Sequence, residues 1–118
     1  MRNTIKKHAD FAMTDNDLMA RSAFFLVRAK PAKFDGDARY GLIVTKRLYK
    51  HAVDRNRAKR LLRDWIAFNE RYMAPDMDYI FIARGLTLTA TRDDGRTAMR
   101  KALHYIAKVH REQKNSKK

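Results

Sequence analysis

The sequence contains no cysteine, no long apolar run and few acidic residues, and each shortage excludes a class of protein. Without cysteine the chain has no disulfide, no thiolate nucleophile and no cysteine-based zinc site, which fits a reducing compartment. Its longest strictly apolar runs, Ala23–Val27 and Tyr79–Ala83, have five residues each. A helix that crosses a bilayer needs ~20 apolar residues, and the N-terminus lacks the apolar core of a secretory signal. We therefore expect a cytoplasmic protein.

Acidic residues are scarce relative to basic ones. The 118 residues include 27 Lys and Arg against 13 Asp and Glu, which gives a formal net charge of +14. Self-repulsion of this size is tolerated where the partner is a polyanion, so nucleic acid is the first candidate and an acidic membrane surface the second. The length suits one compact core, and we expect residues 1–118 to form a single domain.

The first half of the chain predicts two strands and a turn. Residues Ala23–Ala29 and Arg39–Thr45 are rich in side chains that favour strands, and Phe34–Asp37 between them contains the Asp-Gly pair typical of hairpins. Together these segments predict an antiparallel pair. A short, weakly specified helix is expected around His8–Met13.

A helix is predicted from Val53 to Tyr72, because apolar residues recur there with helical spacing. The apolar stripe consists of Ala58, Leu61, Leu62, Trp65 and Ile66. Asp54 lies where it can either cap the helix or interact with the positive end of its dipole. The helix should end before Pro75, because the residue that precedes proline avoids the helical region.

The second half of the chain predicts one more strand and one more helix. Residues Asp78–Ala83 hold a continuous apolar run, which is typical of a strand buried on both faces. Thr91–Asp94 resembles a capping box at the start of a last helix. The apolar face of that helix consists of Met99, Ala102, Leu103, Ile106 and Val109. Residues 111–118 lack apolar side chains and are expected to be a basic, disordered tail.

Basic residues concentrate between Lys46 and Arg63, where Asp54 is the single acid. The bases are Lys46, Arg47, Lys50, Arg55, Arg57, Lys59, Arg60 and Arg63. At about 100° per residue, a polar set projects away from the apolar stripe, and it consists of Asn56, Lys59, Arg60 and Arg63. Arginine binds phosphate oxygens in a bidentate manner and stacks on bases, which favours contact with nucleic acid. The alternative is a solvated helix face, although such faces usually mix charges of both signs.

The protein itself is not predicted to contain a catalytic residue or a metal site. The four histidines have no suitably spaced partner, and neither an H-E-x-x-H motif nor a glycine-rich phosphate loop occurs. Turns and helix capping explain Asp76 and Asp78 after Pro75, and also Asp93–Asp94.

Four motifs occur in a defined order along the chain. Residues Gly41–Arg47 read Gly-Leu-Ile-Val-Thr-Lys-Arg, and Asp54–Arg63 read Asp-Arg-Asn-Arg-Ala-Lys-Arg-Leu-Leu-Arg. Lys6–Phe11 precedes them, and Ile80–Arg84, which reads Ile-Phe-Ile-Ala-Arg, follows. In this order and spacing, over nearly the whole chain, they resemble the bacterial ribonuclease P protein subunit. A bare Arg-Asn-Arg triplet would not be specific, but the triplet with these flanks is.

The resemblance implies an α+β fold, a single two-layer domain in the order α-β-β-β-α-β-α with a central four-stranded sheet. A short strand near Leu18–Arg21 and a left-handed crossover are part of that fold, whereas the usual rule would give a right-handed crossover. The function implied is that of the protein component of an endoribonuclease, with the catalytic RNA and precursor tRNA as partners. The RNA subunit would use Mg²⁺ to remove the 5′ leader. No membrane and no obligate protein partner is predicted.

The resemblance also assigns roles to residues. The RNA-binding positions would be Arg55, Asn56, Arg57, Lys59, Arg60 and Arg63, and the leader-binding cleft would be bordered by Phe11, Lys46, Arg47 and Arg84. Phe11 could stack on an unpaired base or, equally, anchor the first helix to the core. Asp15 and Gly85 depart from the family pattern, which often has an aromatic residue and a base there.

Two other functions stay open at this point. A general RNA-binding or ribosome-associated module would use the same basic helix without any role in processing. A self-sufficient ribonuclease would cleave precursor tRNA without an RNA subunit.

Overall fold

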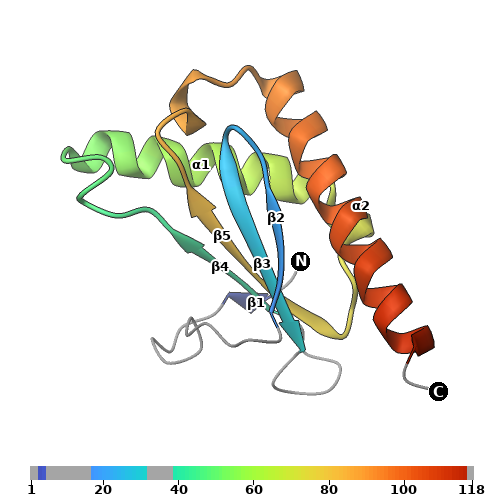
Figure 1. The fold of residues 1–118 in the computed structure, drawn as a ribbon. Helices are drawn as coiled ribbons and strands as arrows, with labels where there is room; N and C mark the ends of the chain where they lie inside the picture. Colours follow the sequence, from blue (N-terminus) through green and yellow to red (C-terminus); the bar gives the residue numbers. More distant parts are fainter. Residues whose placement is uncertain (1–2, 5–16, 32–38, 117–118) are drawn as a thin grey trace.

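The computed structural model describes residues 3–4, 17–31 and 39–116, which form an α+β fold (Figure 1). The strands are β1 (Asn3–Thr4), β2 (Leu18–Arg21), β3 (Phe25–Pro31), β4 (Arg39–Ile43) and β5 (Met77–Ala83). The helices are α1 (Ala52–Phe68) and α2 (Arg92–Ser116). Short 3-10 turns, Glu70–Tyr72 and Thr87–Thr89, precede β5 and α2. The helix expected around His8–Met13 lies outside the described residues.

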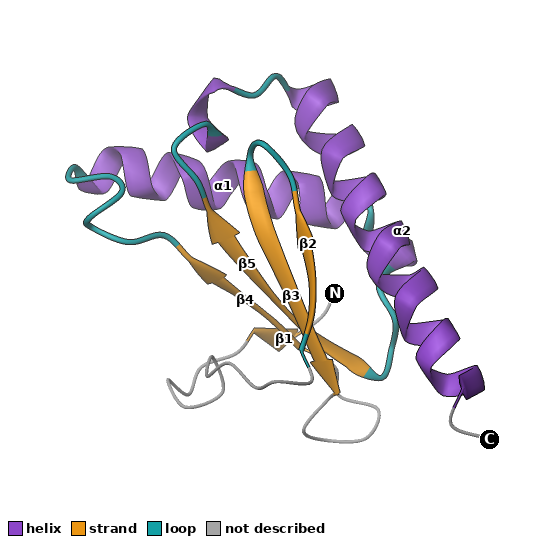
Figure 2. Ribbon diagram, in the orientation of Figure 1, coloured by secondary structure: helices purple, strands orange, loops and turns teal. Residues whose placement is uncertain are grey.

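The strands form one mixed sheet in the order β1-β4-β5-β3-β2 (Figure 2). β5 runs antiparallel to β3 and parallel to β4, so it separates the two strands that we expected to pair. That predicted pairing is wrong, because β5, which comes later in the chain, lies between β3 and β4 in the sheet. The turn predicted at Phe34–Asp37 lies outside the described residues.

The two edges of the sheet are short strands. β2 pairs with β3 in antiparallel register, at the position where the resemblance placed a short strand. β1 adds two residues parallel to β4 and was not predicted from the sequence.

A left-handed crossover joins the parallel neighbours β4 and β5 through α1. In Figure 1, α1 passes behind the sheet, and the chain re-enters the sheet to the right of β4. This hand is opposite to that of nearly all such connections. The family resemblance predicted the left-handed connection, and the general rule did not.

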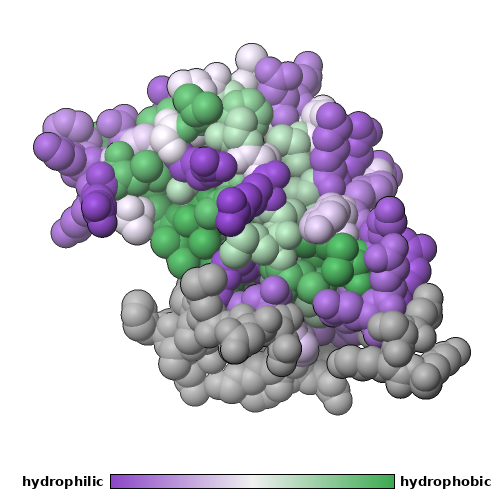
Figure 3. Space-filling view, in the orientation of Figure 1, coloured by the Kyte–Doolittle hydropathy of each residue, from purple (hydrophilic) through white to green (hydrophobic). Residues whose placement is uncertain are grey.

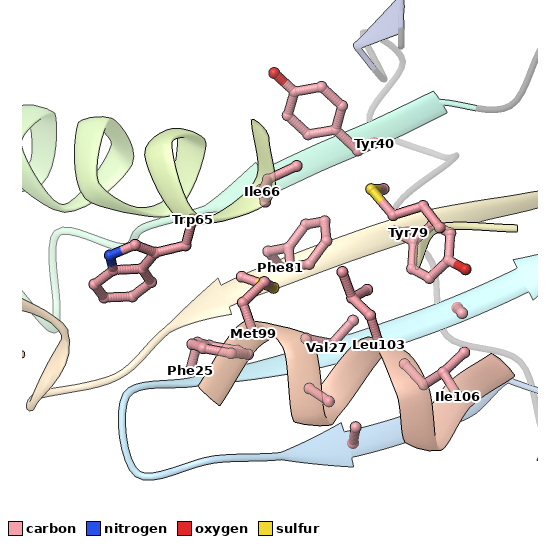
Figure 4. Close-up of a cluster of buried hydrophobic side chains, with 14 of the residues drawn as sticks. Phe25, Val27, Tyr40, Trp65, Ile66, Tyr79, Phe81, Met99, Leu103 and Ile106 are labelled. Atoms are coloured by element: carbon pink, nitrogen blue, oxygen red, sulfur yellow. The ribbon is translucent and has the colours of Figure 1, made fainter. Parts of the chain in front are cut away.

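Both helices cover the same face of the sheet and share one hydrophobic core (Figure 4). Alternate residues of β3 and β5 point into this core, namely Phe25, Val27 and Ala29 together with Tyr79 and Phe81. The helices contribute Leu62, Trp65, Ile66, Met99, Leu103 and Ile106. The apolar stripes predicted for both helices are therefore confirmed.

Helix α1 begins and ends close to its predicted bounds. Its N-cap is His51, which makes no side-chain capping bond. Of the two roles considered for Asp54, capping is therefore wrong. Asp54 lies in the first turn, where a negative charge suits the positive end of the helix dipole. The helix ends at Phe68 and a 3-10 turn follows, so helical structure stops before Pro75 as predicted.

Two arginines of the sheet are buried together with acids. Asp78 is fully buried in β5, where it accepts a hydrogen bond from the Arg39 backbone N–H at 2.7 Å and from its guanidinium at 3.1 Å. Arg28 of β3 donates to Asp17 at 2.8 Å, and both side chains are 4% exposed. The prediction that a turn explains Asp78 is wrong, because this residue neutralises an arginine inside the sheet.

Helix α2 begins as predicted and ends later than predicted. The Thr91 Oγ1 accepts a hydrogen bond from the backbone N–H of Asp94 at 3.1 Å, which confirms the capping interaction. The helix continues to Ser116, so residues 111–116, which we expected to be disordered, are helical. Residues 117–118 lie outside the described part.

The two helices make their tightest contact at Gly95. A Cβ atom on Gly95 would lie 2.0 Å from Cε2 of Trp65, whose indole is fully buried. Glycine is an unfavourable residue inside a helix, so its presence here is explained by the close approach of α2 to the Trp65 ring.

We predict that Gly95→Ala lowers the free energy of unfolding by about 1–3 kcal/mol, the usual cost of overpacking a core. The clash should exceed the gain of about 1 kcal/mol that alanine brings to a helix. Urea unfolding followed by circular dichroism measures the change. Gly85→Ala is the matched control, because no atom lies within 4 Å of the position where its Cβ would be. Equal stability of the two variants would contradict the Trp65 contact.

We predict that Asp78→Ala lowers the free energy of unfolding by about 3 kcal/mol or more. The Arg39 guanidinium would stay buried without the Asp78 carboxylate that neutralises its charge. Asp76→Ala is the control, since its side chain is 48% exposed and lies only two positions away. We expect this control to change stability by less than about 1 kcal/mol. Thermal and urea unfolding of both variants test the difference.

Candidate nucleic-acid interface

Helix α1 presents a row of polar and basic side chains on the side opposite its buried stripe. Asn56, Arg57, Arg60 and Arg63 are exposed, and Lys59 is half-buried. We call these five residues the α1 ridge. The outward projection predicted from helical spacing is confirmed, and the role of the ridge in RNA binding stays a prediction.

The nearest acid on the helix does not neutralise this ridge. Both carboxylate oxygens of Asp64 accept hydrogen bonds from Arg96 of α2, at 3.2 and 3.0 Å. The hydrogen bond that Arg96 donates to Asp64 raises the pKa of Arg96 above its ordinary value. Desolvation opposes this effect, and the negative charges of Asp64 and Asp93 add to it. Among the described residues, no ion pair is seen between the α1 ridge and an acid.

Arg55 has a different role from the ridge. Its Nη1 donates to the backbone carbonyls of Tyr49 and Lys50 at 3.0 and 2.8 Å, and the side chain is only partly exposed. The guanidinium therefore fastens the loop that follows β4 to the start of α1. Part of the hydrogen-bonding capacity assigned to RNA from the sequence is used within the protein.

The loop of residues 44–51 carries Lys46 and Arg47, both exposed. The Tyr49 hydroxyl, from the same loop, lies 2.7 Å from the carbonyl of Arg84 and 3.0 Å from that of Gly85. Because β4 and β5 are parallel, both strands terminate at the same end of the sheet, and Tyr49 connects their two C-terminal ends. Sequence analysis missed this tyrosine, since no local pattern marks a contact made 35 residues away.

Arg84 follows β5 at the same end of the sheet and is exposed. One of its guanidinium nitrogens donates to the Ser22 carbonyl at 2.9 Å, so the side chain reaches the turn between β2 and β3. The structure thus brings Lys46, Arg47 and Arg84 to one end of the sheet. Phe11 and Asp15 lie outside the described residues.

An apolar surface lies next to this edge, on the face of the sheet that α1 and α2 leave uncovered. Leu26, Ile82 and Ile43 are register partners on β3, β5 and β4, and all three are half-buried. Figure 3 shows apolar surface over these strands with hydrophilic side chains around it. An apolar surface that lies beside basic side chains is suited to unpaired nucleotides.

Helix α2 carries further bases that the sequence analysis did not single out. Arg100, Lys101, Lys108 and Arg111 are exposed along its outer side. Their positions on one side of a helix were the available signal, but only the apolar face of this helix was considered and Arg111 was assigned to a disordered tail.

The described residues contain neither a cluster of metal ligands nor a membrane-spanning helix. This part of the chain contains no group of three or more histidine, aspartate or glutamate side chains placed to hold a metal ion. None of its helices is long and apolar enough to cross a membrane.

The fold and the exposed bases define an α+β protein with a cationic surface suited to a polyanion. A family model described as Ribonuclease P matches residues 1–107, and the chain belongs to that family. It is similar to the ribonuclease P protein component of Chromobacterium violaceum, with 34% identity over 87 residues, 74% of this chain and 70% of that protein. For the component of Caulobacter vibrioides, identity is 35% over 101 residues, 80% of this chain and 67% of that protein.

A shorter sequence match and two solved structures also show similarity to ribonuclease P proteins. The component of Bordetella parapertussis is 43% identical over 67 residues, which cover 52% of this chain and 53% of that protein. The RNase P protein of Staphylococcus aureus superposes with a TM-score of 0.72 at 27% identity, over 90% of this chain and 96% of the other. The RNase P protein of Thermotoga maritima has the same fold, with a TM-score of 0.57 at 19% identity over 73% and 84%.

We predict that Arg60→Ala weakens binding to ribonuclease P RNA by about tenfold or more, because a charge-assisted contact with a phosphate is lost. The dependence of log affinity on log salt should become shallower by roughly 0.7–0.9. Thermal stability should stay nearly unchanged, because the side chain is exposed. Filter binding at several salt concentrations and thermal melts provide the measurements.

Arg92→Ala is the charge-matched control, since Arg92 is exposed in the first turn of α2, outside the α1 ridge. We expect this control to alter affinity only slightly. A large loss of stability in Arg60→Ala with unaltered affinity would contradict the assignment of Arg60 to the interface.

Proposed function

We propose that this chain is the protein subunit of ribonuclease P. It would bind the catalytic RNA and the 5′ leader of precursor tRNA, and so assist removal of the leader. The observation that carries the proposal is the α1 ridge, a row of basic side chains with Asn56 that forms no ion pair with an acid among the described residues, on a chain that belongs to this family.

The α1 ridge has the chemistry that a folded RNA requires. Arginine forks match phosphate oxygens in a bidentate manner, and Asn56 can both donate and accept hydrogen bonds. Neutralised phosphates release condensed counterions, which drives association at low salt. Because the buried stripe of α1 holds the helix on the sheet, the ridge is fixed in its outward orientation before RNA arrives.

The opposite face of the sheet supports the second contact. We assign the 5′ leader to the apolar surface of Leu26, Ile43 and Ile82, bordered by the bases at the sheet edge, Lys46, Arg47 and Arg84. Phe11 remains the proposed stacking partner of a leader base. The α1 ridge and this surface lie on different sides of the sheet, so one protein can contact the catalytic RNA and the leader at once.

The chemical step is assigned to the RNA subunit. We propose that the magnesium required for cleavage is held by the RNA and that the protein contributes binding and screening of phosphate repulsion. The chain would thus act as part of a tRNA-processing endoribonuclease, in the cytoplasm.

Reconstitution tests this function. At a magnesium concentration too low for the RNA alone to act, we predict that the protein raises leader removal by ribonuclease P RNA by roughly tenfold or more, about 1.4 kcal/mol. The gain should be larger for precursor tRNA with a leader than for one without it, and Arg84→Ala should reduce that difference. Initial rates of cleavage measured on gels give both quantities.

Two outcomes would favour the other functions. Binding to the RNA without any stimulation of cleavage would indicate a general RNA-binding module. Cleavage of precursor tRNA by the protein and magnesium, with no RNA subunit present, would indicate a self-sufficient ribonuclease, and we expect none.

A further inference from the structure

The outer side of α2 contains a set of exposed side chains that the proposed function does not use. They are Arg100, Lys101, Tyr105, Lys108 and Arg111, and we call them the α2 track. The sequence between Arg96 and Arg111 contains no acidic residue. Tyr105 is 56% exposed, so its ring is accessible to a partner.

Two hollows meet at this track. The first, of about 870 Å³, lies between β2, the turn that follows it and α2. Its apolar lining consists of Met19, Ala20, Ala23, Phe24, Ala98 and Ala102. The second, of about 470 Å³, lies between His104 and the basic side chains of α2. Lys101 and Tyr105 line both hollows, so the apolar hollow and the basic hollow are neighbours on either side of these two residues.

This combination matches the chemistry of an unpaired nucleotide. The volume of the apolar hollow falls within the ~300–1,000 Å³ of small-ligand sites. An exposed aromatic ring can stack on any base, and adjacent cations can hold the phosphates. Arg21 lies on the opposite wall of the apolar hollow, and it is exposed as well. Among the described residues that line this hollow, Asp94 is the one acid, and it would direct phosphates away from its own end and toward Lys101.

The arrangement of the helices indicates which RNA would lie here. A smaller hollow of about 190 Å³ is lined by Phe68 of α1 and by Arg96 and Arg100 of α2, so the surface is continuous from one helix to the other. The Asp64–Arg96 pair fixes the two helices together at this point. Met19 and Arg21, which line the first hollow, are register partners of Arg28 and Leu26, so this hollow also borders the leader surface. The contact of α2 with the end of α1 and the basic side chains along α2 favour the RNA that binds the α1 ridge.

We propose that the α2 track binds an unpaired segment of the ribonuclease P RNA, with one base stacked on Tyr105 in the apolar hollow and the flanking phosphates on Lys101 and Lys108. This inference rests on the proposed function and extends it to a second contact with the same RNA. Figure 3 shows apolar surface between β2 and α2, bordered by hydrophilic side chains along α2.

The test compares Tyr105→Ala with the wild-type full chain, in binding to ribonuclease P RNA and in hydroxyl-radical footprinting of that RNA. We expect an affinity loss of roughly fivefold or more, the effect of one lost stacked base, and loss of protection at one unpaired segment. Tyr105→Phe should restore both, because the ring is kept. Protection that depends on Arg60 should remain in Tyr105→Ala.

Leu86→Ala is the control for loss of an exposed apolar side chain, since Leu86 is 51% exposed and lines neither hollow. Thermal melts of every variant exclude unfolding as the cause of weaker binding. Wild-type affinity and footprint in Tyr105→Ala would overturn the inference, and would leave the apolar hollow open to a protein partner. A change confined to the preference for substrates with a leader would also overturn it.

The proposed function and this inference fail in different ways. If the wild-type chain neither binds ribonuclease P RNA nor stimulates cleavage, the proposed function is wrong. If the wild-type chain does both and Tyr105→Ala is indistinguishable from it, only the second contact is wrong.

Discussion

The orientation of α1 depends on the burial of Trp65. The indole is fully buried, with its ring centroid 6.0 Å from that of Phe25 and 6.3 Å from that of Phe24, and Gly95 of α2 closes over it. Positions on a helix have fixed angular relations, so once Trp65 and its stripe face the sheet, Arg60 and Arg63 must face outward. The Trp65 side chain therefore packs against the sheet and both helices, and its burial determines which way the cationic surface of α1 faces.

Patterns within a single segment predicted most of the elements but not the way they assemble. The apolar spacing around Trp65 gave α1 to within a few residues, and the run Tyr79–Ala83 gave a strand covered on both faces. The prediction that β3 pairs with β4 was wrong. A turn sequence between two strands does not show that a third strand, later in the chain, lies between them in the sheet. The hand of the crossover came only from the family resemblance, since general sterics favour the opposite hand.

The candidate site was predictable to the extent that it lies on one helix. Helical periodicity alone separates the exposed Arg60 from the buried Trp65. It does not show that Arg55 bonds to the preceding loop, or that Tyr49 connects the ends of β4 and β5, because those contacts depend on the tertiary fold. The bases of α2 were overlooked for a different reason. Arg111 lies in a segment that was taken as disordered, although a helix anchored by Leu103 and Ile106 can continue past its last buried residue. Arg100, Lys101 and Lys108 lie inside the predicted helix, of which only the apolar face was considered.

The acids of the chain are distributed in a way that gives the protein a neutral interior and a cationic exterior. Three of the ion pairs in the described part join arginines and acids at structural positions: Arg28 with Asp17, Arg39 with Asp78, and Arg96 with Asp64. The first two are buried in the sheet, where an unpaired arginine would be costly, and the third ties α1 to α2. Acids engaged in this way cannot neutralise the helix surfaces. The exposed basic side chains of the α1 ridge and of α2 are therefore not paired with these three acids, and they stay accessible to solvent and to a polyanion.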